Sequence, residues 1–214
     1  MKLLIIIFFL FFKFFTTSVL SENQNDPVEL LNEKQKGLYY GANNCVGDDC
    51  LYFFSEFLKS IENDKNLKET WLYGWFTYWY GDVLYNLNQP TEAIEIWEKI
   101  LSDEHFKEGP NKTYRTNSLI ALGWIYYTDL KYLDDEKSFN FMKEAAENGN
   151  GWALNNLGVF YEMGRNTKKN MEKAFLNYKK ASEKGIHWAY ANLANFYILG
   201  EGNVEKDYQK ALFL

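Results

Sequence analysis

The chain has few of the residues from which catalytic and metal sites are usually built. Its 214 residues include two cysteines and two histidines, His105 and His187, which lie far apart. We find no Ser-His-Asp arrangement, no phosphate-binding glycine loop and no ligand cluster with zinc-site spacing. We therefore expect no catalytic residue, no metal and no cofactor, and we predict that the chain is not an enzyme.

Proline and positive charge are also scarce. Three prolines and the lack of a Ser/Gly-rich tract argue against a flexible linker between domains. The formal net charge is −6, and lysines alternate with acids, as at Glu172-Lys173 and Glu183-Lys184. Such alternation is typical of a solvated helix face, whereas a nucleic-acid-binding surface needs a basic stripe. Nucleic acid is thus excluded as an expected partner.

The chain does contain an internal repeat. Four residues recur 36 positions later, with Ala153, Leu157, Gly158 and Tyr161 matched by Ala189, Leu193, Ala194 and Tyr197. A period of this length holds one helical hairpin, which cannot bury its apolar face unless neighbouring hairpins stack. Nineteen per cent aromatic content supplies a large core for such a stack. The spacing therefore predicts an all-α array of hairpins and favours a binding scaffold.

Further copies extend the array toward the N-terminus. Leu122, Gly123 and Tyr126 repeat the pattern upstream, and a looser copy contains Gly81. Glycine inside a helix costs about 0.5–1 kcal/mol, so these positions imply close helix packing. The predicted organisation is a helical region over 22–70 followed by repeats at 71–109, 117–150, 151–185 and 186–214, the last of them incomplete.

The pattern A-x3-L-G/A-x2-Y-x2-G, followed by K-A-x3-Y and A-A/S-x2-G, resembles the Sel-1-like repeat, a relative of the tetratricopeptide repeat. The copy from residue 186 matches best, at Ala189, Leu193, Tyr197, Gly200, Gly202, Val204, Asp207, Lys210 and Ala211. The likeness covers residues 117–214 with good specificity and 71–101 more loosely. It implies a right-handed α-solenoid.

The N-terminal segment resembles a secretory signal. Lys2 is followed by the apolar run LLIIIFFLFF, and Val19 and Ser21 are small enough to precede a cleavage site. We predict a signal peptide over residues 1–21, whose removal changes the net charge from −6 to −8. The alternative is an uncleaved anchor, although Lys13 leaves the run short of the roughly 20 residues that a spanning helix needs.

Two further features fit an oxidising compartment. Cys45 and Cys50 flank a turn-prone stretch, and we predict a disulfide between them rather than a metal site. Closing so short a loop stabilises the fold by roughly 2 kcal/mol in the chain-entropy model. Asn111-Lys112-Thr113 is an N-glycosylation sequon, which we expect to lie on an exposed connection and to be used if the source is eukaryotic.

Helical solenoids usually bind partners on the concave wall formed by the first helix of each hairpin. By the geometry of the family, that wall presents Trp124, Tyr127, Asn155, Val159, Glu162, Asn192, Asn195 and Ile198. Amides can pair with the backbone of an extended peptide while aromatic rings fill pockets. The alternative is that several of these side chains pack against the next repeat.

The resemblance also suggests a role. Eukaryotic members with signal peptides resemble the lumenal adaptor of the membrane ubiquitin-ligase complex in endoplasmic-reticulum-associated degradation. That likeness implies a lumenal adaptor that binds the ubiquitin ligase, lectins or misfolded glycoproteins, and that reaches the membrane only through partners or an uncleaved signal anchor. Two alternatives stand beside it: a bacterial exported repeat protein, periplasmic or secreted, and an enzyme like some cysteine-rich bacterial relatives, which carry a cysteine pair in each repeat that is missing here.

The sequence stops at KALFL, inside the predicted second helix of the last repeat. Because repeat arrays normally end in a polar cap, we expect either a longer parent protein or a surface that a partner completes.

Overall fold

The computed structural model describes residues 26–214, which contain helices and no strand. The predicted signal peptide lies outside the described residues. The N-terminal part comprises a short 3-10 helix, η1 (Pro27–Leu30), then α2 (Glu33–Asn44), α3 (Asp49–Ser60) and α4 (Lys65–Lys68). Four hairpins follow: α5 (Trp71–Asn86) with α6 (Pro90–Ser102), α7 (Lys112–Thr128) with α8 (Asp135–Glu147), α9 (Gly151–Met163) with α10 (Met171–Glu183), and α11 (His187–Leu199) with α12 (Tyr208–Leu212).

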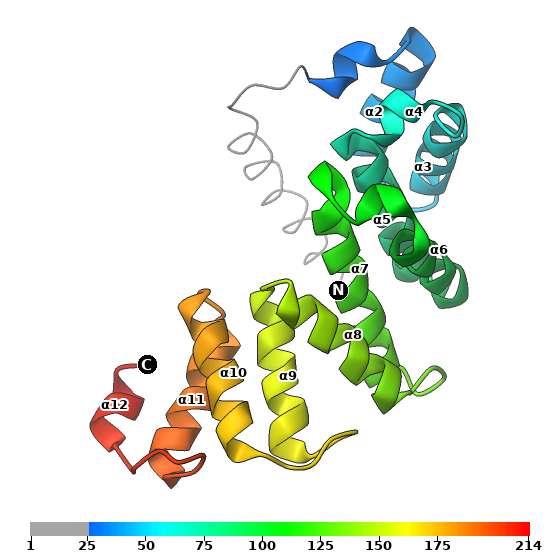
Figure 1. Ribbon diagram of the computed structural model, residues 1–214. Helices are drawn as coiled ribbons and strands as arrows, with labels where there is room; N and C mark the ends of the chain where they lie inside the picture. The colour runs from blue at the N-terminus through cyan, green and yellow to red at the C-terminus, as the bar shows by residue number, and fades with distance from the viewer. Residues whose placement is uncertain (1–25) are drawn as a thin grey trace.

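The hairpins stack into a curved array, which confirms the predicted all-α solenoid. Each helix packs against its predecessor and its successor, and α5 and α7 lie on the inner side of the curve while α6 lies on the outer side (Figure 1). Between α6 and α7 run two 3-10 turns, η2 (Glu104–Phe106) and η3 (Gly109–Asn111). None of the helices within residues 26–214 is both long and apolar enough to cross a membrane.

A glycine in the first helix of three hairpins admits a large side chain from the second helix. The pairs are Gly81 with Trp97, Gly123 with Met142, and Gly158 with Tyr178. A Cβ atom at Gly158 would lie 2.6 Å from Cε1 of Tyr178, far inside van der Waals contact. The packing role that the sequence predicted for Gly158 is therefore confirmed, and these pairs also fix the register between repeats.

The tyrosine of the first helix and the lysine near the start of the second helix belong to one recurring structural unit. The side chain of an Asp or Asn begins the second helix by accepting a hydrogen bond from the backbone N–H of the motif lysine, as Asn170 does from Lys173 at 2.8 Å. The ammonium of that lysine lies 5.2 Å from the ring centre of Tyr161 on the first helix. The same three-part unit recurs in two other hairpins, as Asp134, Lys137 and Tyr126, and as Asp207, Lys210 and Tyr197.

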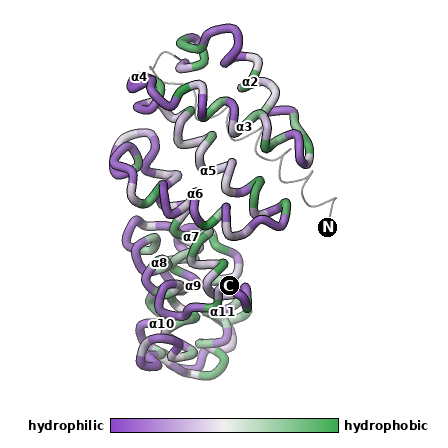
Figure 2. The backbone as a smooth tube through the Cα atoms, turned by 90° about the vertical axis from the view of Figure 1, so that its right-hand side faces the viewer, coloured by the Kyte–Doolittle hydropathy of each residue, from purple (hydrophilic) through white to green (hydrophobic). Residues whose placement is uncertain are grey.

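The core is thickest in the N-terminal half. One continuous cluster of buried side chains runs from Leu31 in the N-terminal part to Tyr126 in α7, so the first helices are packed onto the repeat array. Phe57 and Phe76 stack at its centre with ring centroids 3.6 Å apart. Toward the C-terminus the clusters shrink, and α12 has no buried residue. Figure 2 shows apolar and polar positions alternating along the helical tube.

The structure joins Cys45 and Cys50 in a disulfide between the end of α2 and the start of α3, with the two Cα atoms 5.1 Å apart. Each helix end is thereby held against the other. The side chain of Asp48, inside the loop that the bond closes, is exposed.

The expectation of an exposed glycosylation site is wrong. Asn111 ends η3 with 1% of its surface exposed. Its Oδ1 accepts a hydrogen bond from the backbone N–H of Gly74 at 3.0 Å, and its Nδ2 donates to the backbone carbonyl of Lys68 at 3.1 Å. Because a glycan on Nδ2 has no room in this fold, Asn111 is a structural clamp between α5 and the turn before α7.

Candidate protein-binding surface

Helices α7, α9 and α11, the first helices of their hairpins, present equivalent positions. The register of the repeats aligns Trp124 with Val159 and Asn195, and Tyr127 with Glu162 and Ile198. Three of these six side chains are exposed, Trp124 by 51% and Ile198 by 41%, with Asn195 beside them in the row. We call Trp124, Asn195 and Ile198 the open row.

Tyr127 is partly covered by a loop. The guanidinium of Arg165, just after α9, lies 4.1 Å from the ring centre of Tyr127. The same guanidinium forms a two-point ion pair with Asp135 at the start of α8, and this contact raises the pKa of Arg165. The Tyr127 ring is therefore held in place and leaves part of its surface open beside Trp124.

Asn155 does not belong to the binding surface that the sequence predicted. It is buried, and its Oδ1 accepts a hydrogen bond from Nδ2 of Asn192 at 3.0 Å. This bond links α9 directly to α11, so the two amides connect neighbouring repeats instead of facing a partner. Glu162 is half-buried and accepts a 2.6 Å hydrogen bond from the buried Tyr178 hydroxyl, while Val159 packs against the core. For Asn155, Asn192 and Val159 the alternative of packing between repeats is the better description, whereas Glu162 is held within its own hairpin.

Three segments match the family model described as Sel1 repeat, at residues 116–150, 153–186 and 189–214. Residues 116–214 therefore carry three Sel1 repeats. A search of the curated proteins found no match. Sel1 repeats mediate protein–protein interactions and generally form non-enzymatic scaffolds, so the general expectation of a binding scaffold is confirmed.

Two solved structures resemble the whole array. A Sel1 repeat protein from Oxalobacter formigenes aligns with a TM-score of 0.62 and 20% identity over 88% of this chain and 72% of that chain. The protein c5321, a protective antigen of uropathogenic Escherichia coli strains with an SLR fold, aligns with a TM-score of 0.60 and 21% identity over 84% of this chain. This chain spans 35% of the length of c5321. At such identities the likeness establishes the fold.

The sequence reasoning missed two exposed tryptophans of the Sel1 repeats. Trp152 and Trp188 lie in the first turn of α9 and α11, exposed by 50% and 65%. They are 36 residues apart and therefore occupy equivalent positions. The repeat alignment could have revealed them, because it places a tryptophan at the same position in the first turn of two helices. At such a position an aromatic side chain is not needed for the core.

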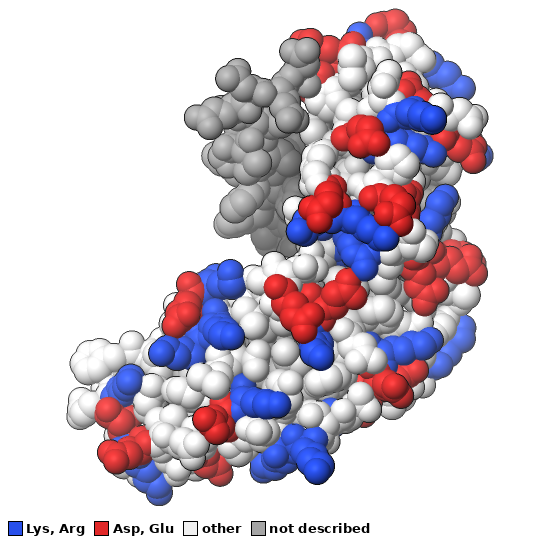
Figure 3. Space-filling view, viewed as in Figure 1, with Lys and Arg blue, Asp and Glu red and all other residues white. Residues whose placement is uncertain are grey.

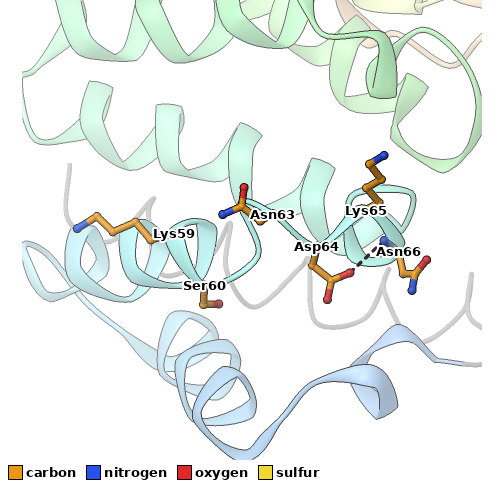
Figure 4. Close-up of a pocket in the computed structure, with 6 residues that line it drawn as sticks. All are labelled: Lys59, Ser60, Asn63, Asp64, Lys65 and Asn66. Carbon is orange, nitrogen blue, oxygen red and sulfur yellow. Dashed lines mark hydrogen bonds between the residues drawn. The ribbon is translucent and has the colours of Figure 1, made fainter.

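One open hollow lies outside the Sel1 repeats. It encloses about 540 Å3 at the connection between α3 and α4, and Figure 4 shows its lining of polar side chains. Asp64 uses its carboxylate to cap the four-residue α4, accepting from the backbone N–H of Asn66 at 3.0 Å. Residues 26–214 contain no group of three or more side chains placed to hold a metal ion.

The two histidines occupy different surroundings. His187 is exposed at the start of α11. His105 contacts Asp103 through Nδ1 at 2.7 Å, and the hydroxyl of Tyr73 donates to the same carboxylate at 2.8 Å. Burial raises the pKa of Asp103, but the hydrogen bonds from His105 and Tyr73 outweigh it and hold this pKa below the usual range. The cluster closes the junction between α5 and η2.

Charges are mixed on the visible face of the molecule. Figure 3 shows Lys and Arg side chains interspersed with Asp and Glu over α7 to α12, without a continuous stripe of either sign. The open row itself is uncharged, so its contacts with a partner rest on apolar area and amide hydrogen bonds.

Proposed function

We propose that this protein is a non-enzymatic adaptor of the secretory pathway that binds protein segments along its open row. The observation that carries the proposal is the exposure of Trp124 in the first Sel1 repeat, of Asn195 at the aligned position in the third repeat, and of Ile198 three residues further along α11. Tryptophan is one of the residue types enriched in protein-binding hot spots, and Trp124 is half exposed. The Cys45–Cys50 disulfide supports an oxidising compartment.

The more specific role is that of a lumenal adaptor for quality control in the endoplasmic reticulum. Its partners would be a membrane ubiquitin ligase, lectins and misfolded glycoproteins, and nucleic acid would not be among them. The family resemblance, the apolar N-terminal sequence and the disulfide support this role. The sequon no longer does, because Asn111 is buried.

The second candidate is a bacterial exported Sel1-repeat protein that acts in the envelope or on host proteins. Both solved structures described above come from bacteria, and one of them is a protective antigen of pathogenic strains. A disulfide forms equally well in the periplasm. The two candidates share the open row and differ in compartment and partner.

Affinity purification from native cells in mild detergent tests both. The tagged wild type and a variant with Trp124→Ser and Ile198→Ser are purified in parallel, and the co-purifying proteins are identified by mass spectrometry. Recovery of a membrane ubiquitin ligase and lumenal lectins with the wild type alone supports the quality-control adaptor. Recovery of envelope or host proteins supports the second candidate, and equal recovery with both forms refutes binding at the open row.

A further inference from the structure

A second hollow lies on a different part of the molecule, between the second helices of two neighbouring hairpins. It encloses about 350 Å3, with α8 and α10 as its walls and α9 as its floor. The three helices run side by side in Figure 1. Leu154, Leu157 and Tyr161 of α9 form the apolar floor, and none of them belongs to the open row.

The rim of this hollow is basic although the chain is acidic overall. Lys143 on α8 and Lys173 and Lys180 on α10 surround it, with Glu147 as the one acid. Within residues 26–214 none of these four side chains forms an ion pair. Three unpaired ammonium groups around one apolar floor create a local positive potential in a protein of net charge −6.

This basic rim is particular to one junction of the array. The pairs of glycine and large side chain align Met142 with Trp97 and with Tyr178, and they thereby set the register of the second helices. In that register Lys143 corresponds to Glu98, and Lys180 corresponds to Glu144. The preceding junction thus carries acids where this one carries Lys143 and Lys180, so these two charges are not a by-product of the repeat motif, whereas Lys173 is the motif lysine that Lys137 matches.

Lys173 and Tyr161 place two hydrogen-bond donors, an ammonium and a hydroxyl, at the floor of the hollow. The Lys173 ammonium lies 5.2 Å from the ring centre of Tyr161, and this contact holds both groups at the hollow. The side chain of Tyr161 is half-buried, and its contacts within residues 26–214 are the Lys173 ammonium and the ring of Phe139, so that its hydroxyl makes no hydrogen bond to a described side chain. It is available to donate a hydrogen bond to a carboxylate, which is the group that the lysines attract.

We propose that the hollow between α8 and α10 binds an acidic peptide segment of a partner protein, with one aliphatic side chain of that segment on the apolar floor. Carboxylates of the segment pair with Lys143, Lys173 and Lys180. The volume accommodates a single side chain with part of its backbone, so the segment is short. This second surface lets the scaffold hold one partner between α8 and α10 while the open row holds another.

Fluorescence anisotropy with a labelled probe tests the proposal on the full-length protein. The probe is a nine-residue peptide of eight glutamates with a central leucine, and a matched peptide carries serine at the centre. The test variant combines Lys143→Glu, Lys173→Glu and Lys180→Glu. The control combines Lys99→Glu, Lys168→Glu and Lys179→Glu, which makes the same charge change at exposed lysines outside the hollow.

We expect the wild type and the control variant to bind the leucine peptide with affinities within a few-fold of each other. The test variant should bind at least about tenfold more weakly, since three rim charges are reversed. The serine peptide should bind more weakly than the leucine peptide, and Tyr161→Phe should reduce affinity without changing the circular dichroism spectrum.

Three results would overturn the proposal. One is no binding of the leucine peptide by the wild type at low salt. Another is equal weakening in the test and control variants, which would indicate that binding depends on the overall charge of the protein and not on the lysines of the hollow. The third is equal binding of the leucine and serine peptides, which would remove the apolar floor from the interaction. We expect both triple variants to remain folded, because all six lysines are exposed. Thermal unfolding of each variant checks this expectation.

Discussion

Gly158 is packed closely against the side chain of Tyr178. A methyl group there meets the ring of Tyr178 at 2.6 Å, and both helices are fixed by neighbours on either side. We expect Gly158→Ala to lower the free energy of unfolding by about 1–3 kcal/mol in urea titrations, because the ring must move in a close-packed core. Gly37→Ala is the matched control. Gly37 lies in α2 with open space around it, so alanine should stabilise by about 0.5–1 kcal/mol. A stabilised Gly158→Ala would contradict the packing account.

Asn111 is expected to act as a clamp and not as a glycan acceptor. Asn111→Ala leaves the N–H of Gly74 and the carbonyl of Lys68 without their partner, which should cost about 1–3 kcal/mol for each buried group. Thr113→Ala destroys the same sequon at an exposed position and should change stability by less than about 0.5 kcal/mol. Protein from eukaryotic cells should show no change in gel mobility on Thr113→Ala. A faster-migrating band in that variant would show that Asn111 carries a glycan.

The carboxylate of Asp103 should make stability depend on acid pH. Because its pKa is lowered in the folded state, the stability that it contributes is present above about pH 4, the ordinary range of an aspartate, and is lost as the pH falls through the folded value. The difference in melting temperature between the wild type and Asp103→Asn should therefore be largest near neutral pH and should shrink in acid. Asp48→Asn, at an exposed site, is the control. A difference that is independent of pH would refute the role of this charge.

At the scale of the elements, the sequence predicted the hairpins well because their signals are local. The cap, the lysine and the tyrosine of each of the three C-terminal hairpins lie within one hairpin, and the lysine always follows the cap by three residues, so the motif specifies the unit. The surroundings of Asn111 and Asn155 could not be predicted. Asn111 contacts Lys68 and Gly74, which are 43 and 37 residues away, and Asn155 contacts Asn192 in the next hairpin. Such partners are known only once neighbouring elements are placed against each other.

The disulfide between α2 and α3 should stabilise the folded protein by restricting the conformations of the unfolded chain. Replacing both Cys45 and Cys50 by serine should lower the free energy of unfolding by roughly 2 kcal/mol, because the cross-link no longer restricts the unfolded chain. Chemical denaturation of the double variant and of the wild type, each in reducing and in non-reducing buffer, measures this loss of unfolding free energy. If reduction leaves the wild type unchanged, the bond does not hold the ends of α2 and α3.

At the scale of the whole molecule, stability should fall along the array. Solenoid stability is approximately a sum over repeats and their interfaces, and the core shrinks from the N-terminal cluster to the few buried side chains around Tyr178 and Phe196. We expect amide hydrogen exchange to be faster in residues 186–214 than in residues 120–150. Exchange in α5 (Trp71–Asn86) should be slower than in both. Equal protection of 186–214 and 120–150 would contradict a graded array.

The central claim is that the open row contacts a partner protein. Incorporation of a photo-crosslinking amino acid at position 195, in the open row, and separately at position 99, on the exposed side of α6, tests this claim in living cells. The account predicts discrete crosslinked partners from position 195 that are missing from position 99 and that disappear with Trp124→Ser. Adducts from position 99 alone, or identical adducts from both positions, would contradict it.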